Sequence, residues 1–509
     1  MAATEHGFVV IGAQSVGFSI TNLRTLKELE RGKYPVAIGE DIFAAHQILP
    51  ETVDAIVAAF TAIQQLFADY GVKAISVSGS HSFFEAQNAQ FVWDQLLSRT
   101  GWAVQPQTLA QESFYRTQAV FARFPHFSEI TKTGTVLIDI SSGSVELTAF
   151  NDGEFGFSRN LSLGPLRVYE VMSDLQRTVN NYVEVMQDYI DSRLLDFMRL
   201  LPHAEQYPNM ILMGSALSLF ETLIPTGERM VETDRDGFDL IYREVTHSSD
   251  QYLSEEYDLP INQVEQVLPT VLLLYRLVKT LNSQRIFISN LKLLDGLEAD
   301  AAWAAGFRPV TLDPTKEIIQ SAQNLADRYQ VDVAHRDATV TFVLQLFDRL
   351  KKLHGLGKRE RLLLQIAATI NDIGSYVDTH KHYEHSDYII RASELMGLTR
   401  TEQEMVATIA RYHSSDLPQL NLGDLPEMGA ARRLIIAKLS ALLRVADSLD
   451  ASRQQKITAM RVSLRQDAVV LTATASDDIA LERWTLQQKG KFFTAVFGLP
   501  IELKGRTSR

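Results

Sequence analysis

The run Leu137–Leu147, Leu-Ile-Asp-Ile-Ser-Ser-Gly-Ser-Val-Glu-Leu, joins two apolar segments through a turn of four small residues. Residues Val136–Ile138 have strand character and deliver the carboxylate of Asp139 to the turn, and a second strand is expected over Val145–Phe150. Small side chains allow the backbone N–H groups of such a turn to close on a phosphate oxygen. A carboxylate at its mouth can hold Mg²⁺ or orient an attacking water. The alternative is an ordinary hairpin with a polar turn.

Strand and helix patterns alternate on both sides of this run. The predicted elements before it are strands at 8–11 and 18–21 around Gly12–Gly17, a helix at 50–70, a strand at 74–77 and a helix at 89–100 closed by Gly101. Those after it are helices across 166–200 and a strand near 210–213. That strand runs into Gly214-Ser215-Ala216, either a simple strand-to-helix turn or a contact for an adenosine. Two units that each open with strand, small-residue turn and strand predict a duplicated α/β architecture with a cleft between the halves.

The pattern changes near Thr315, after which amphipathic helical periodicity continues nearly to Leu449. Strand character returns at 460–464 and 469–474. The predicted domains are therefore 1–125, 126–310, 311–452 and 453–509.

Composition narrows the class of protein. The 509 residues are 46% hydrophobic and 22% charged, as in ordinary globular proteins, and none is cysteine. The net charge of −13 argues against wrapping nucleic acid, and no apolar run reaches the roughly 20 residues that span a bilayer. We expect a cytoplasmic protein with neither nucleic acid nor membrane as a partner. The basic cluster 351–361 is either a solvated loop or a local groove for a polyanion.

Five segments in order resemble the Ppx/GppA family of exopolyphosphatases and guanosine-pentaphosphate phosphatases, which belongs to the superfamily of actin and the acetate and sugar kinases. The segments are Val36–Glu40, Ser80–Asn88, Gln111–Ser113, Asp139–Leu147 and Leu161–Arg167. The resemblance implies duplicated actin-like (ribonuclease H-like) α/β domains with an interdomain cleft. It also implies an all-α HD-like domain and a small C-terminal α+β part after them.

The helical region carries the pieces that resemble an HD-type domain. They are His335, Asn371, Asp372, His382, His385, His413 and Asp447. Metal-binding HD proteins use a His-Asp pair where this chain has Asn371-Asp372, and Asn is a poor substitute for imidazole on a transition metal. We therefore favour a structural helical domain, with a metal site or a polyanion contact as the alternatives.

The chemistry that the resemblance implies is removal of a terminal phosphate from inorganic polyphosphate or a guanosine polyphosphate, with Mg²⁺ as cofactor, by a homodimer. Glu112 would be the general base, although it is equally a helix N-terminal carboxylate favoured by the dipole. Asp139 and Glu146 would hold Mg²⁺ or position the water. The residues assigned to phosphate are Ser15, Ser141, Ser142, Gly143, Ser144 and Arg167.

The chain departs from the family pattern in the first domain. Its first phosphate loop aligns with Gly12–Gly17 and keeps only Ser15, and two arginines of the pattern are Ala37 and Phe84 here. In the second loop two of three glycines are serines, which are strained if those positions need a positive φ. The sequence therefore predicts an exopolyphosphatase-like hydrolase, with a catalytically impaired protein that binds polyphosphate or nucleotide as the alternative.

Overall fold

The computed structural model describes residues 4–124, 126–141, 143–176, 178–198, 207–225, 228–307, 314–393, 395–414, 423, 425 and 428–507. The chain divides into two compact units, Met1–Pro314 and Thr315–Arg509. The predicted boundaries at 125/126 and 452/453 fall inside these units, and the division lies close to the predicted boundary at 310/311. Within the described residues, no helix is long and apolar enough to cross a membrane.

The first sheet of unit 1 has the strand order β3-β2-β1-β4-β5. Its strands are β1 Glu5–Ile11, β2 Ser15–Asn22, β3 Lys27–Pro35, β4 Ala74–Gly79 and β5 Gln105–Pro106. The first three pair antiparallel, and β4 runs parallel to β1. The helices are α1 Ile38–Ala45, α2 Pro50–Asp69, α3 His81–Phe84 and α4 Ala89–Thr100. The predicted elements in this part are confirmed, whereas β3 was not predicted because five of its nine residues are charged and no apolar run marks the strand.

The second sheet has the strand order β10-β11-β9-β6-β7-β8. Its strands are β6 Thr135–Ile140, β7 Val145–Asn151, β8 Glu154–Leu161, β9 Asn209–Met213, β10 Met230–Asp234 and β11 Arg285–Ser289. Its helices are α7 Pro165–Gln176, α8 Tyr182–Met198, α9 Ser218–Glu221, α10 Arg235–His247, α11 Asp250–Tyr257, α12 Ile261–Val264 and α13 Val267–Thr280. The sheet packs against a single apolar core, because α13 buries nine of its residues and every residue of β6 and β9 is buried.

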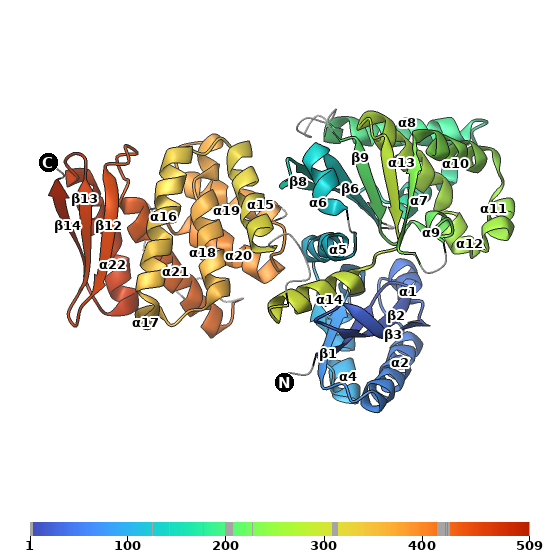
Figure 1. Ribbon diagram of the computed structural model, residues 1–509, viewed down its shortest axis with the longest axis horizontal. Helices are drawn as coiled ribbons and strands as arrows, with labels where there is room; N and C mark the ends of the chain where they lie inside the picture. Colours follow the sequence, from blue (N-terminus) through green and yellow to red (C-terminus); the bar gives the residue numbers. More distant parts are fainter. Residues whose placement is uncertain are drawn as a thin grey trace. The chain divides into compact units, whose positions relative to one another are not determined.

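Helix α14 (Leu293–Ala304) belongs by sequence to the second predicted domain but packs against β1, β2 and helix α5 (Leu109–Arg123) (Figure 1). The approach of α14 to α5 requires Gly296, since a Cβ there would lie 1.8 Å from the carbonyl oxygen of Tyr115. Short segments α6 (Phe127–Ile130) and η1 (Thr131–Thr133) link α5 to β6.

An ionic network fastens α14 in place. Its acids Asp295 and Glu298 are fully buried, and together with Glu28 they form one of two groups of metal-ligand type among the described residues. Three arginines already neutralise this group, with Arg31 at 2.8 Å from Asp295, Arg123 at 2.6 Å from Glu298 and Arg229 at 2.5 Å from Glu28. Buried charges that are paired in this way hold elements in register, so the group is structural.

Unit 2 is helical up to Ser448, and β-strands follow (Figure 1). Its helices are α15 Pro314–Arg328, α16 Val333–Arg349, α17 Lys351–His354, α18 Lys358–Ile370, η3 Ile373–Tyr376, α19 His382–Ala392, α20 Arg400–Arg411 and α21 Ala430–Ser448. The C-terminal elements are β12 Ile457–Leu464, β13 Val469–Ala475, α22 Ala480–Phe497 and β14 Ile501–Thr507. Helix α22, which was not predicted, packs against α21 and joins the C-terminal part to the helical part.

The basic cluster 351–361 lies on α17 and the start of α18. Arg359 forms a two-pronged ion pair with Glu402, and Arg361 forms one with Asp348. These arginines are engaged by neighbouring helices, which favours the solvated-loop interpretation over a polyanion groove.

Candidate functional site

The hairpin β6–β7 brings three polar side chains into one row. Asp139 on β6 pairs directly with Glu146 on β7, and Glu146 pairs with Asn160 on β8. Directly opposed residues of antiparallel strands point to the same face, so the predicted register of Asp139 and Glu146 is confirmed. Asn160 was not predicted, because only the pairing of β8 with β7 places it beside Glu146.

The turn between these strands is hydrogen-bonded within itself. The amide of Ser141 donates to the carbonyl of Ser144 at 2.9 Å, and the amide of Ser144 donates to Ser141 Oγ at 3.2 Å. In this arrangement one amide is engaged by a backbone carbonyl and the other by a serine hydroxyl, and the assignment of these residues to phosphate stays a prediction. Ser142 lies outside the described residues. Ser141 does not have a positive φ, so the serine in place of glycine at this position carries no backbone strain.

Gly214, which follows β9, lies against Asp139 and Ile140 at the end of β6. Its φ is +118°, and a Cβ there would lie 2.1 Å from the carbonyl oxygen of Ile140 and 2.7 Å from Asp139 Oδ1. The amide of Ala216 donates to the Ile140 carbonyl at 3.1 Å. The segment Gly214-Ser215-Ala216 therefore supports the β6 end.

Helix α5 presents Glu112 and Arg116 on one face, one helical turn apart. A capping box between Thr108 and Gln111 fixes the start of this helix. Glu112 Oε1 accepts from the amide of His81 at 2.6 Å, and Glu112 Oε2 accepts from Arg116 Nη2 at 2.8 Å. The Nε of Arg116 donates to Asp139 Oδ2, so one guanidinium bridges the predicted base and the predicted metal ligand.

Arg116 was not predicted. Its spacing of four from Glu112 places both on one helix face, but only the packing of α5 against β6 shows that Asp139 is the second partner.

A small pocket lies at the β6–β7 turn. It is lined by Arg116, Asp139, Ser141, Ser144, Glu146 and Asn160. Glu146 Oε1 accepts from Ser158 Oγ at 2.5 Å. Ser15 at the start of β2 and the exposed Arg167 on α7 do not line this pocket, so their assignment to phosphate stays a prediction.

The charges in the pocket strongly perturb one another. The pKa of Asp139 is raised to about 6, mainly by burial and also by the charge of Glu112, against the opposing effect of Arg116. Burial works to lower the pKa of Arg116, but the carboxylates of Asp139, Glu112 and Glu146 outweigh it and raise that pKa. Arg116 is therefore a fixed cation, and Asp139 changes charge near neutrality.

Of the three predicted carboxylates, one has an oxygen that suits Mg²⁺. Asp139 Oδ1 is buried and has no hydrogen-bond partner, which leaves one oxygen available as a ligand. Glu112, Asp139 and Glu146 do not form a group of closely spaced ligand atoms in the part of the chain that the structure describes. Mg²⁺ commonly uses one or two carboxylates together with phosphate oxygens and water, and Asp139 suits that mode.

Asp139 gives a pH dependence of stability. Because its pKa is about 6 in the folded protein against a usual 3.8, the folded state binds the proton more tightly. Its contribution to the free energy of unfolding should therefore fall as pH rises from 3.8 to about 6, and stay constant above. The measurement is the thermal unfolding midpoint of the wild type and of Asp139→Asn without divalent cations. The difference between the two midpoints should change with pH only between 3.8 and about 6. A difference independent of pH would contradict this assignment.

In unit 2 the residues predicted as an HD-like set divide into two groups. His335 Nδ1 contacts Asp450 Oδ2 at 2.9 Å, and His335 Nε2 contacts Asp447 Oδ1 at 3.3 Å. The buried ammonium of Lys489 on α22 pairs with Asp447. Burial acts to lower the pKa of His335, but hydrogen bonds to Asp447 and Asp450 prevail and raise it to about 9. An imidazolium with both nitrogens donating has no lone pair for a metal, so this half is an ion-paired cluster.

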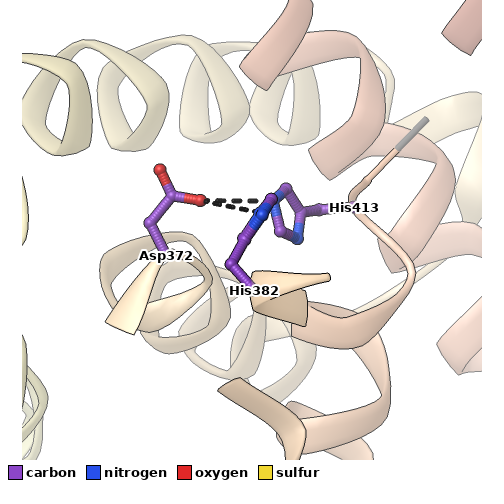
Figure 2. A group of neighbouring side chains, drawn as sticks. All are labelled: Asp372, His382 and His413. Atoms are coloured by element: carbon purple, nitrogen blue, oxygen red, sulfur yellow. Dashed lines mark hydrogen bonds and ion pairs between the residues drawn. The ribbon is translucent and has the colours of Figure 1, made fainter. Parts of the chain in front are cut away.

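The other half brings together Asp372, His382 and His413 (Figure 2). Asn371 is buried beside them and donates to Asp372 Oδ1 at a long 3.4 Å. His385 is half-buried on α19 and is not a member of the group.

The geometry of unit 1 narrows the class of protein. Each of its sheets begins with three antiparallel strands and continues with parallel ones, apart from β10, which pairs antiparallel with β11. The acidic pocket lies at the β6–β7 turn of the second sheet. This arrangement is the duplicated α/β architecture that the sequence predicts.

The Ppx/GppA phosphatase family model matches residues 18–302, and the model of domain III of Ppx/GppA phosphatases matches residues 319–490. The chain belongs to the Ppx/GppA phosphatase family. The match confirms the family predicted from the five segments.

Individual relatives align with this chain over shorter stretches than the family model does. A guanosine-5'-triphosphate,3'-diphosphate pyrophosphatase of Photobacterium profundum is 27% identical over 187 residues, 36% of this chain and 36% of that protein. A protein of the same name from Aeromonas hydrophila is 28% identical over 156 residues, 30% of this chain and 31% of that protein. The aligned part thus spans about a third of the length of these relatives.

Two solved structures share the fold. An exopolyphosphatase from Cytophaga hutchinsonii has a TM-score of 0.51 at 15% identity and covers 59% of this chain and 98% of its own. The Aquifex aeolicus PPX-GPPA enzyme has a TM-score of 0.51 at 13% identity and covers 58% of this chain and 99% of its own. At these identities the likeness shows the fold alone.

Proposed function

We propose that this chain is a phosphoanhydride hydrolase that releases the terminal phosphate of polyphosphate or of guanosine pentaphosphate. The observation that carries the proposal is the Glu112 carboxylate, which accepts from the His81 amide and from Arg116, the guanidinium that also binds Asp139 in the pocket at the β6–β7 turn. The names of the relatives support the choice of these substrates.

The reaction needs a base, a cation and a means of stabilising phosphate charge. Glu112 takes a proton from the attacking water, and the oxygen of that water bonds to the terminal phosphorus. The bridging P–O bond breaks, and its oxygen leaves with the shortened chain. Asp139 would hold Mg²⁺ through its unpartnered Oδ1, and the ion would supply charge neutralisation on the phosphate.

Arg116 brings an arginine to the site from a position other than the two in the family pattern. The family's arginines align with Ala37 and Phe84, whereas Arg116 reaches the pocket from α5. A guanidinium offers a planar set of donors that suits phosphate oxygens. We assign phosphate binding to Arg116 on this ground.

The binding-only alternative rests on a specific observation. Both oxygens of Glu112 accept hydrogen bonds, and two amides of the turn are engaged internally. Release of phosphate from long-chain polyphosphate and from guanosine pentaphosphate, measured with and without Mg²⁺, separates the two functions. Turnover above the buffer rate supports hydrolysis, and saturable binding without turnover supports the alternative.

Replacing Arg116 by Gln should weaken polyphosphate binding about 10–100-fold, because a charge-assisted hydrogen bond contributes about 1.5–3 kcal/mol. The measurement is equilibrium binding of polyphosphate, with KM as a second readout if turnover is found. Arg99→Gln is the matched control, since Arg99 forms an exposed ion pair with Asp54 on the surface of the same unit. Equal affinity of both variants would remove Arg116 from the phosphate site.

A further inference from the structure

Three side chains of unit 2 direct one ligand atom each toward a common point (Figure 2). Asp372 follows α18, His382 is the first residue of α19, and His413 follows α20. Asp372 Oδ1 lies 3.5 Å from His382 Nε2 and 3.3 Å from His413 Nε2. The two Nε2 atoms lie 3.1 Å apart.

These separations match the coordination shell of a small cation. Zinc-type ions bind imidazole nitrogen and carboxylate oxygen at about 2.0–2.1 Å in tetrahedral geometry, which puts neighbouring ligand atoms about 3.3–3.4 Å apart. Two nitrogens and one oxygen are also a donor set that suits zinc and similar transition metals better than Mg²⁺ or Ca²⁺.

A backbone hydrogen bond orients the imidazole of His413. Its Nδ1 lies 2.5 Å from the carbonyl oxygen of Ala410, an acceptor only, so Nδ1 carries the hydrogen. In the neutral ring Nε2 then presents its lone pair to the group. The ring of His382 likewise has a hydrogen bond with the backbone of Thr379. Such outer contacts commonly orient metal-binding histidines.

The carboxylate and the backbone around it are also fixed. Asp372 Oδ2 accepts from Arg453 Nη2 at 2.6 Å, which leaves Oδ1 facing the histidines. Gly374 lets the start of α19 approach, because a Cβ there would lie 2.0 Å from the carbonyl oxygen of His382. Ser386 Oγ donates to the Asn371 carbonyl at 2.6 Å and ties the two segments together. The three ligands thus come from a preorganised frame.

We propose that Asp372, His382 and His413 bind one zinc-type divalent cation, with the fourth position open to water or a phosphate oxygen. The site adjoins the His335–Asp447–Lys489 cluster, since His335 Nε2 lies 3.9 Å from Asp372 Oδ2, but the charges of that cluster are already paired. It also differs from the carboxylate pocket of unit 1 in its donors and goes beyond the proposed hydrolysis there.

Titration of the metal-free full chain with Co²⁺ tests this site. We expect one equivalent to bind with the intense visible absorption of tetrahedral Co²⁺, and Zn²⁺ to displace it. His382→Ala and His413→Ala should each weaken binding at least about 100-fold. Loss of an outer contact to a metal ligand already costs up to about 100-fold, and loss of a ligand itself should cost no less. His385→Ala is the matched control, because His385 lies three residues further along α19 outside the group. Asp139→Asn should leave the signal unchanged, which excludes the pocket of unit 1.

Folding is checked by far-UV circular dichroism, and His382→Gln serves as the milder variant because this side chain is 19% exposed. No tetrahedral Co²⁺ signal in the wild type would overturn the site. Binding that survives both the His382 and His413 changes, or that is lost equally in His385→Ala, would overturn it as well.

Discussion

Replacing Glu112 by Gln is expected to lower phosphate release from long-chain polyphosphate by about 10²–10⁴-fold, the usual contribution of a general base. Gln has the same shape and keeps an oxygen that can accept from the His81 amide or from Arg116. It cannot take a proton from water. The loss should therefore appear in kcat, measured as phosphate released under saturating polyphosphate with Mg²⁺.

Glu129→Gln is the control for this experiment, since Glu129 on α6 is 75% exposed and lies outside the pocket. Unchanged thermal unfolding of Glu112→Gln would show that the loss is chemical. Equal phosphate release by the wild type and Glu112→Gln would exclude Glu112 as the base.

Gly214→Ala should destabilise unit 1 by about 3 kcal/mol or more. The added Cβ meets backbone atoms of Ile140 at 2.1 and 2.6 Å, and such atoms cannot rotate away. The positive φ adds strain for any residue with a Cβ, and overpacking and strain each cost about 1–3 kcal/mol. The measurement is the free energy of unfolding of the unit 1 transition by calorimetry. Displacement of Asp139 should also reduce phosphate release.

Gly143→Ala in the adjoining turn is the matched control. A Cβ there has nothing within 4 Å and its φ is not positive, so we expect a change within about ±0.5 kcal/mol. If the two alanine variants unfolded alike, the close approach of Gly214 to β6 would be wrong.

The local elements could be predicted because contiguous residues encode them. Helix α4 spans the predicted Ala89–Thr100 and ends at Gly101 in the left-handed region. The spacing of Asp139 and Glu146 around a four-residue turn sets their pairing, as the structure confirms. Periodicity and turn chemistry act over a few residues and need no knowledge of the fold.

The partners of those residues could not be predicted in the same way. An ion pair joins Arg116 to Asp139, 23 residues further along the chain, and Lys489 meets Asp447 across 42 residues. Such pairs depend on how helices pack, and many arrangements are compatible with one periodic pattern. Helix α14 shows the same limit, since only the tertiary structure shows that it packs against β1, β2 and α5.

By itself, the sequence determined the family, the hairpin that carries Asp139 and Glu146, and the change to a helical region near Thr315. Only the tertiary structure decided that Arg116 bridges Glu112 and Asp139, and that serine side chains close the turn. It also decided that Lys489 neutralises the His335 group while Asp372 meets His382 and His413. Short-range sequence patterns fix the face of a helix or strand on which a residue lies. Charge pairing follows from packing between distant segments, and that packing sets the chemistry of the His335 group and of the Asp372 group.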